Sequence, residues 1–331
     1  MDSTRVLRSV AGVAILWPVL LSAGCGGSAE PGAGGPAPTI VVDGSSTVYR
    51  ISMAARDAFH VIEPSTVVVV DYHGTGAGFN KYLEGEIDIV DASREAKASE
   101  EAKAKAQGID WTRFVVGYDG ITLVVNPKND FVKSLSVEQL KKLWQPESKV
   151  MTWKDIDPAW PDRKIILYSP DDDSGTFEFF TEAIMGKSKS QREDVQQSSD
   201  DNFLVHGVSN DNDALGYFGY AYYAAHKESL RAVPVQNGSS APAVLPSPAT
   251  IVDKTYAPLS RPLFIYAKNS SARRPEVSRF LTHYLGKVEQ FAVEGGYAHL
   301  TAEDEASNQK SLAQLIPGTT ASPNTKSPAT K

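Results

Sequence analysis

The chain has 331 residues, a hydrophobic fraction of 41% and a formal net charge of -7. This length exceeds one ordinary hydrophobic core and predicts two lobes of about 100–150 residues each, with a cleft between them. The negative charge argues against nucleic acid as a partner, because nucleic-acid binding needs a dense cationic surface. An acidic protein also repels anions at long range, so any anion that it binds must be held by short, directed hydrogen bonds.

The N-terminus has the features of an export signal. Arg5 and Arg8 precede an apolar stretch at residues 10–21, which is too short to span a bilayer but suits the core of a signal peptide. The run LSAGC, ending at Cys25, resembles the bacterial lipobox, in which the cysteine is acylated and becomes the mature N-terminus, although Ser22 stands where leucine is preferred. We therefore predict a signal peptide at 1–24 and an exported protein anchored to the cell envelope, periplasmic or on the outer surface. The alternative is an incidental cysteine in a discarded signal peptide.

Cys25 is the only cysteine, which excludes an intramolecular disulfide. Residues 25–38 combine this cysteine with a Gly- and Pro-rich segment that we expect to be a flexible tether reaching roughly 20 Å. Residues 317–331 are rich in Pro, Thr, Ser and Lys, and we expect a disordered tail there.

Between these ends, short β-branched runs alternate with helical patterns, which predicts an α/β fold with largely parallel sheets. The strand candidates are residues 40–42, 67–70, 87–90, 114–116, 121–125, 165–168 and 263–267. The helix candidates are residues 48–59, 98–107, 137–144, 177–185 and 275–285, the third of them behind a Ser136/Gln139 capping box. The aromatic segments at 144–161 and 217–223 suit either stacking platforms or core packing, and we favour the core.

Three strand candidates run into a loop of Ser, Thr and Gly that opens a helix, at residues 43–47, 74–78 and 174–176. The first N–H groups of a helix lack internal acceptors and lie at the positive end of its dipole, so they bind anions without net charge. Each loop alone also suits a plain helix cap or turn. Together, at the carboxyl ends of strands, they predict an anion site. Its candidate residues are Ser45, Ser46, Thr47, Thr75, Gly76, Ser174, Gly175 and Thr176.

Other phosphate and catalytic motifs are incomplete. The run GTGAG has Phe79 where a dinucleotide fingerprint needs its third glycine, and GKS at 186–188 has Thr181 where a Walker A loop needs its first. The six histidines lack metal-ligand spacing, no G-x-S-x-G elbow is present, and the three aspartates at 171–173 lack the calcium-loop pattern. We predict no enzyme, no cofactor and no metal site.

Seven motifs follow one another in order along the chain, within a region of about residues 39 to 299: DGSSTV, GTGAGF, DIVDASR, DGITLVVNP, DSGTFEFF, ALGYFGYAYY and PLSRPLFIY. This set resembles the phosphate-binding component of the bacterial phosphate ABC importer. The resemblance implies a two-lobed type II periplasmic-binding-protein fold, each lobe a mixed, mainly parallel sheet flanked by helices. It places residues 39–119 and 253–316 in one lobe and 120–252 in the other, with inorganic phosphate between them. We expect a monomer that docks on the importer's membrane permease.

The hydroxyl and glycine positions of this family match Ser46, Thr47, Thr75 and the Ser-Gly-Thr at 174–176, whereas two charged positions do not. Arg94 stands where well-known members have aspartate, and Pro170 where they have arginine. We hypothesise that Arg94 supplies the cation and that Asp119 accepts a phosphate proton, which sulfate lacks.

Several alternatives remain open at this stage. Arg94 also suits a surface ion pair with Glu95 or Asp91. The alternative functions are a receptor for another oxyanion such as sulfate, molybdate or tungstate, an exported enzyme such as a phosphatase, and a surface adhesion or sensing protein.

Overall fold

The computed structural model describes residues 37–172 and 174–318. The predicted signal peptide, Cys25, nearly all of the tether and most of the tail lie outside these residues. None of the helices in the described part is long and apolar enough to cross a bilayer.

The strands are β1 (Thr39–Gly44), β2 (Val67–Val70), β3 (Ile89–Ala92), β4 (Trp111–Val125), β5 (Leu135–Ser136), β6 (Ile166–Pro170), β7 (Gln196–Ser198), β8 (Ala214–Gly219), β9 (Arg231–Ala232), β10 (Val235–Gln236), β11 (Ala243–Val244) and β12 (Ser260–Lys268). The helices are α1 (Ser46–Ile62), α2 (Thr75–Glu84), α3 (Ala98–Ala106), α4 (Val137–Trp144), α5 (Gly175–Met185), α6 (Asp201–Asn210), α7 (Tyr220–Ala225), α8 (Pro248–Val252), α9 (Pro275–Gly286), α10 (Val288–Glu294) and α11 (Ala302–Leu315). Two single turns of 3₁₀-helix lie at Trp153–Asp155 and Ser271–Arg273.

The main sheet has the strand order β2-β1-β3-β12-β4-β8-β6-β7, with β9 also paired to β4. A small second sheet has the order β11-β10-β5. In the main sheet β1 pairs in parallel with β2 and β3, and β6 with β7 and β8, whereas β12 and β4 pair antiparallel with their neighbours. The fold is therefore a mixed α/β fold, with the parallel pairs on either side of an antiparallel centre.

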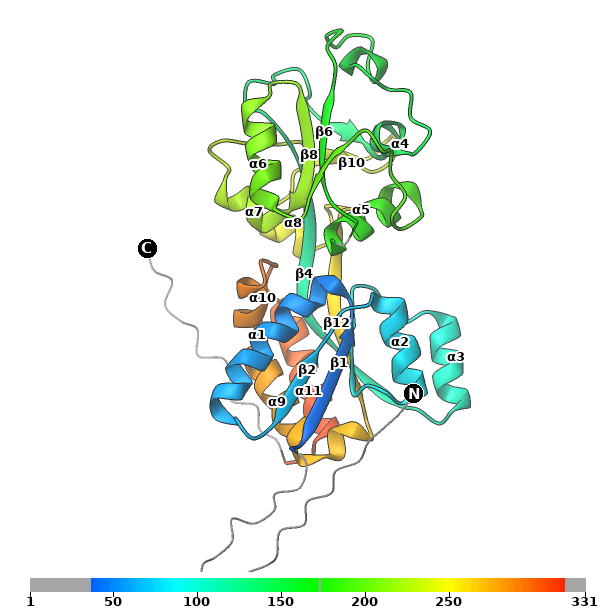
Figure 1. The fold of residues 1–331 in the computed structure, drawn as a ribbon, viewed down its shortest axis with the longest axis vertical. Helices are drawn as coiled ribbons and strands as arrows, with labels where there is room; N and C mark the ends of the chain where they lie inside the picture. The colour runs from blue at the N-terminus through cyan, green and yellow to red at the C-terminus, as the bar shows by residue number, and fades with distance from the viewer. Residues whose placement is uncertain (1–36, 173, 319–331) are drawn as a thin grey trace, which may run out of the picture. The chain divides into compact units, whose positions relative to one another are not determined.

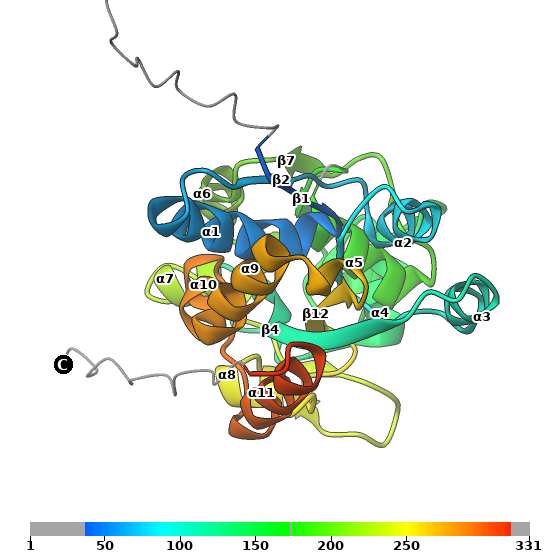
Figure 2. The ribbon, with the colours of Figure 1, turned by 90° about the horizontal axis from the view of Figure 1, so that it is seen from below.

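The two largest hydrophobic clusters of the described residues define the lobes. The first lies under α1, α9 and α10, which lie side by side in Figure 2. The second surrounds Trp144, Trp153 and Tyr217, which are fully buried, so core packing is the correct interpretation of these aromatic residues. The strand β4 contributes to both cores, and β12 follows directly after a residue of the second core. Figure 1 shows these two strands passing between the lobes.

The strand β4 differs from the sequence prediction of two strands at 114–116 and 121–125. The residues between them stay in the sheet because Gly117, Tyr118, Asp119 and Gly120 all pair with β12. The predicted lobe boundary at 119/120 therefore falls inside one continuous strand. The boundaries at 119/120 and 252/253 stay a prediction.

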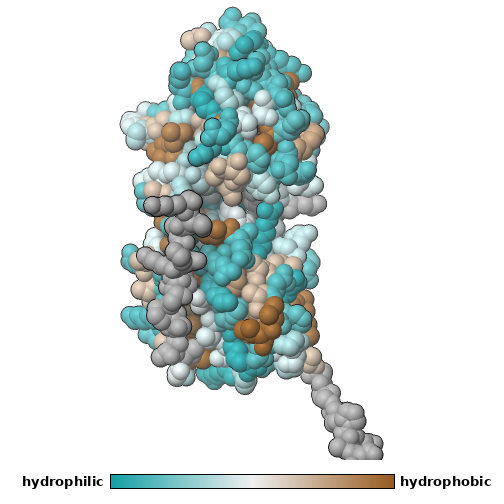
Figure 3. Space-filling model, turned by 90° about the vertical axis from the view of Figure 1, so that its left-hand side faces the viewer, coloured by the Kyte–Doolittle hydropathy of each residue, from teal (hydrophilic) through white to brown (hydrophobic). Residues whose placement is uncertain are grey.

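Local chemistry explains where the helices begin. The Ser136/Gln139 capping box opens α4 as predicted, since each side chain accepts a hydrogen bond from the other residue's backbone N–H. In α1, Val48, Ile51, Ala55 and Phe59 form the buried face. The molecular face in Figure 3 is mainly hydrophilic, with small separate hydrophobic patches.

Candidate functional site

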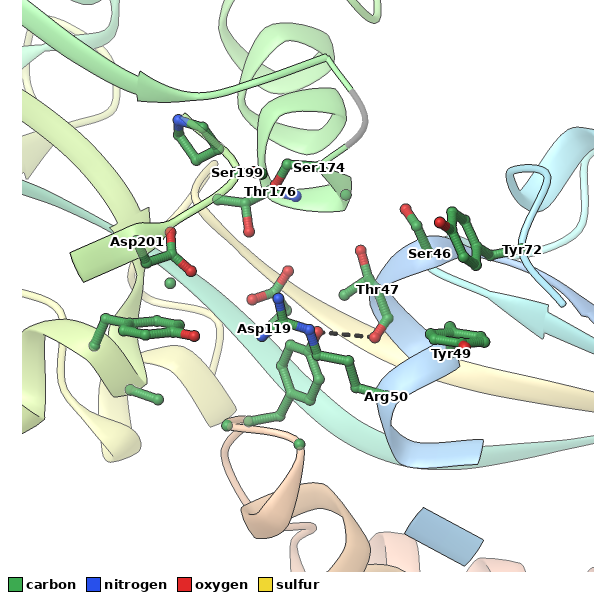
Figure 4. A pocket seen from close by; sticks show the side chains of 18 of the residues that line it. Ser46, Thr47, Tyr49, Arg50, Tyr72, Asp119, Ser174, Thr176, Ser199 and Asp201 are labelled. Carbon is green, nitrogen blue, oxygen red and sulfur yellow. Dashed lines mark hydrogen bonds between the residues drawn. The ribbon is translucent and has the colours of Figure 1, made fainter. Parts of the chain in front are cut away.

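A pocket of about 270 Å³ lies where α1 and α5 begin. Because α1 packs in the first core and α5 in the second, this pocket lies between the lobes. Figure 4 shows side chains from both lobes pointing into it. Its polar and aromatic lining includes Ser46, Thr47, Tyr49, Arg50, Tyr72, Asp119, Asp171, Ser174, Gly175, Thr176, Ser199, Asp201, Tyr222 and Tyr297.

The first predicted loop is fixed against β3. Gly44 has φ +140°, and a Cβ there would lie 2.1 Å from the carbonyl oxygen of Asp91, so the position requires glycine. The N–H of Ser45 donates to the same carbonyl oxygen at 2.8 Å. The Ser45 side chain is buried and accepts a hydrogen bond from the N–H of Thr47 at 3.2 Å, which makes it the cap of α1. Ser46 and Thr47, in contrast, line the pocket.

The third predicted loop meets the first one across the pocket. Ser174 caps α5 by accepting a hydrogen bond from the N–H of Thr176 at 3.2 Å, and all three residues of this Ser-Gly-Thr loop line the pocket. A Cβ on Gly175 would lie 2.3 Å from Oγ1 of Thr47. The starts of α1 and α5 are therefore so close that only a residue without a side chain fits between them.

The second predicted loop, with Thr75 and Gly76, lies next to the first but outside the lining of this pocket. The N–H of Gly74 donates to the carbonyl oxygen of Gly44 at 2.7 Å, so α2 begins against the first loop. Oγ1 of Thr75 lies 3.1 Å from Oγ of Ser93 and accepts a hydrogen bond from the Ser93 N–H at 3.1 Å. The part of these two residues in ligand binding stays a prediction.

Arg94 lies beside the second loop and outside the lining of the first pocket, since a Cβ on Gly76 would lie 3.8 Å from its Nη2. Its guanidinium donates two hydrogen bonds of 2.9 Å to the carboxylate of Glu100, which is neither of the two partners considered from the sequence. Arg94 lines a second pocket, of about 480 Å³, together with Ser93, Phe179 and Arg261. Whether Arg94 contacts the ligand stays a prediction.

Asp119 lies in the first pocket and is paired with an arginine that the sequence analysis missed. Asp119 is 3% exposed, and Arg261 stands directly opposite it in the antiparallel β4–β12 ladder. Nη2 of Arg261 donates to Oδ2 of Asp119 at 3.3 Å, and the guanidinium stacks on the Phe179 ring at 3.9 Å. Burial raises the pKa of Asp119, while Arg261 and the N–H of Gly120 act in the opposite direction.

Arg50 is a second arginine that the sequence analysis missed. It lies one turn into α1 and lines the pocket together with Tyr222, Asp201 and Tyr297. Burial alone would lower the pKa of Arg50, but Tyr297, Tyr222 and Asp201 together raise it. Because Tyr222 and Asp201 belong to α7 and α6, Arg50 faces residues of the other lobe across the pocket. The sequence signal that could have identified Arg50 is its position three residues after Thr47, since residues i and i+3 share a helix face.

The pocket suits a small oxyanion that carries a proton. Two helix N-termini supply N–H groups and a favourable dipole, the neighbouring hydroxyls supply further donors, and Asp119 supplies an acceptor. Within residues 37–172 and 174–318, no group of three or more His, Cys, Asp or Glu side chains is placed to hold a metal ion.

The fold and the pocket define a two-lobed solute-binding protein, and comparisons with known proteins agree. Residues 29–287 match the model of the PBP superfamily domain. The chain is 42% identical over 268 residues to Protein SphX of Synechocystis, covering 80% of this chain and 79% of the relative. It is 35% identical over 298 residues to the phosphate-binding protein PstS of Staphylococcus saprophyticus, covering 90% and 91%. The crystal structure of a possible phosphate binding protein from Planctomyces limnophilus has 43% identity and a TM-score of 0.80, covering 85% of this chain and 100% of that one.

The chain therefore belongs to the PstS family of phosphate-binding proteins. This confirms the family predicted from the ordered motifs, and with it the two-lobed type II periplasmic-binding-protein fold. Membership makes the chain a solute-binding protein and not an enzyme.

Proposed function

We propose that this protein is an extracytoplasmic lipoprotein receptor that binds inorganic phosphate between its lobes and delivers it to the membrane permease of an ABC importer. The observation that carries the proposal is the meeting of α1 and α5. Each helix brings a capped N-terminus with Ser and Thr hydroxyls to one pocket, and each comes from a different lobe. A phosphate bound there joins the lobes, which is how a two-lobed receptor closes on its ligand.

The strength of such a site is adequate for a receptor. Hydrogen bonds to a charged group contribute about 1.5–3 kcal/mol each. Several such bonds from the two helix starts exceed the roughly 8 kcal/mol of a micromolar site, even after the costs of association.

Asp119 supplies the basis for choosing phosphate over sulfate. Phosphate carries a proton near neutral pH, and this proton forms a hydrogen bond with a buried carboxylate. Sulfate lacks the proton and places a bare oxygen against the carboxylate. Sites built around such a bond discriminate by roughly 10⁴–10⁵.

Isothermal titration calorimetry of the purified full-length chain tests the proposal, with phosphate, arsenate, sulfate and molybdate as separate titrants. We expect phosphate and arsenate to bind with micromolar or tighter affinity and sulfate to bind at least 10³-fold more weakly. Binding of sulfate or molybdate in preference to phosphate would make the protein a receptor for another oxyanion. The absence of binding by all four anions would refute anion binding altogether.

The lipid anchor and the permease are separate parts of the proposal. The lipobox-like run before Cys25 supports acylation of that cysteine. Similarity to a phosphate-binding protein PstS supports phosphate as the ligand. We expect a Cys25→Ser variant to lose incorporation of a labelled fatty acid and to leave the membrane fraction. Deletion of the gene should abolish high-affinity phosphate uptake by cells, and the soluble variant should restore it poorly. Gel filtration is expected to show a monomer.

A further inference from the structure

Arg261 is placed to do more than neutralise Asp119. Its Nη2 lies within hydrogen-bonding distance of three acceptors: Oγ1 of Thr47 at 3.0 Å, Oδ2 of Asp119 at 3.3 Å and the carbonyl oxygen of Gly175 at 3.3 Å. These acceptors belong to α1, β4 and α5, so this one nitrogen touches both lobes and the strands between them. Because Nη2 carries two hydrogens, it satisfies at most two of the three acceptors at a time.

The other nitrogen on the same edge of the guanidinium is unused. Nε of Arg261 is buried and has no hydrogen-bond partner among the described residues. Nε and Nη2 form one side of the arginine fork, which matches two oxygens of a phosphate. The Arg261 side chain is 12% exposed and stacked on Phe179, so the fork is held in place before any ligand arrives.

We propose that Arg261 is the cation of the phosphate site, an inference that rests on the proposed function. The Nε–Nη2 edge donates to two phosphate oxygens, which replace Thr47 and Gly175 as acceptors because a charged oxygen accepts more strongly than a hydroxyl or carbonyl. Asp119, beside it, accepts the phosphate proton. The cross-strand pair thus supplies both the cation and the proton acceptor.

Two other arginines are less suited to this role. Arg94 is engaged in two hydrogen bonds with Glu100, and Arg50 lies among Tyr222, Tyr297 and Asp201, which raise its pKa. Arg261 also lies between the two groups of residues predicted for the site. It contacts Thr47 and Gly175 of the first pocket and lines the second pocket with Ser93 and Arg94. A phosphate bound to Nε and Nη2 of Arg261 would therefore lie between the residues of the first pocket and those of the second pocket.

The test is calorimetric titration of phosphate and sulfate into full-length wild type, Arg261→Gln, Arg261→Lys and Arg94→Gln. Arg113→Gln is the matched control, since Arg113 is also on the β4–β12 ladder and also stacks on a phenylalanine, Phe264. We expect Arg261→Gln to weaken phosphate binding about 100- to 1,000-fold and Arg261→Lys about 10-fold, because lysine keeps the charge and loses the fork. Arg113→Gln should leave the affinity unchanged.

The outcomes separate this inference from the proposed function. Wild type that fails to bind phosphate refutes the proposed function and the inference with it. Wild type that binds phosphate while folded Arg261→Gln binds within threefold of it refutes the inference alone. A large loss in Arg94→Gln without a loss in Arg261→Gln assigns the cation to Arg94 instead.

Folding of the variants is checked by thermal denaturation, because Arg261→Gln leaves the buried carboxylate of Asp119 unpaired. If that variant does not fold, the double variant Asp119→Asn/Arg261→Gln replaces it, since its pair leaves no buried charge unpaired. This double variant is compared with Asp119→Asn, and a further loss of at least 30-fold supports Arg261 as the cation. Equal phosphate affinities of the double variant and Asp119→Asn overturn the inference that Arg261 is the cation.

Discussion

At Gly175 the starts of α1 and α5 leave no room for a side chain, and Gly175→Ala tests whether this close approach belongs to the phosphate-bound form. A Cβ there would lie 2.3 Å from Oγ1 of Thr47, 2.8 Å from Oγ of Ser46 and 2.9 Å from the backbone nitrogen of Thr47. Ordinary contact begins at 3.4 Å, so clearing the Thr47 hydroxyl by movement of the helices alone takes a separation of about 1.1 Å, the difference between 3.4 and 2.3 Å. That shift moves donors of one lobe beyond the 2.7–3.2 Å range of a good hydrogen bond.

The expected loss follows from the bonds that this separation breaks. Losing one or two hydrogen bonds to a charged ligand, at about 1.5–3 kcal/mol each, costs about 2–5 kcal/mol. This corresponds to a phosphate Kd that is about 30- to 3,000-fold higher. The variant keeps the backbone N–H of residue 175, so the loss reports the separation of the helices and not a missing donor.

The assay is phosphate titration of wild type and Gly175→Ala, with Gly286→Ala as control. Gly286 ends α9, and a Cβ there would meet nothing within 4 Å. Thermal unfolding without phosphate shows whether both variants are folded. A folded Gly175→Ala that binds phosphate as wild type does would mean that α1 and α5 stand further apart around the ligand, and the reasoning would be wrong.

Three further predictions concern aspartates and a cap. Asp119→Asn should reduce the phosphate-over-sulfate ratio from about 10⁴–10⁵ to below about 10², and an unchanged ratio removes Asp119 from its assigned role. Burial raises the pKa of Asp91 well above its usual range, although a hydrogen bond from Ser52 opposes this. The contribution of Asp91 to the free energy of unfolding is therefore greatest below about pH 3.9. It declines as the pH rises toward the pKa of Asp91 in the folded state, by at most about 1.4 kcal/mol per pH unit. Urea unfolding from pH 4 to 8 should show wild type losing stability relative to Asp91→Asn, and parallel pH profiles would contradict this. Ser45→Ala should lower the free energy of unfolding by about 1 kcal/mol, measured in urea, because it removes the cap of α1; an unchanged value would mean that the cap contributes nothing.

The sequence was most informative where structure is decided locally. The three Ser/Thr-Gly loops do open α1, α2 and α5, because a capping side chain or a glycine acts on the backbone within two or three residues of itself. The capping box at Ser136 and the buried face of α1 are local in the same sense. Comparison of ordered motifs added the family, and the relatives confirm it.

The sequence was least informative about which loops share one pocket. That depends on the strand order of the sheet, and Thr75 follows the edge strand β2 while Ser46 follows its neighbour β1. Arg261 shows the same limit more strongly. Its partner Asp119 is 142 residues away in the chain, and the two meet only because β4 and β12 pair in one register. An arginine two residues before the strand expected at 263–267 gives no local sign of that pairing.

The place of Asp119 and Arg261 on strands shared by both lobes has a mechanical consequence. In a rotation of one lobe about β4 and β12, an atom is displaced in proportion to its lever arm from those strands. The pair itself has almost no lever arm. Tyr72, which is half exposed, follows β2, and β2 lies three strand spacings from β12, or about 14 Å. If the ligand binds as proposed, the fold keeps its recognition near the pivot and moves Tyr72, on the pocket lining away from the pivot, further; a fluorophore at position 72 would then report phosphate binding optically.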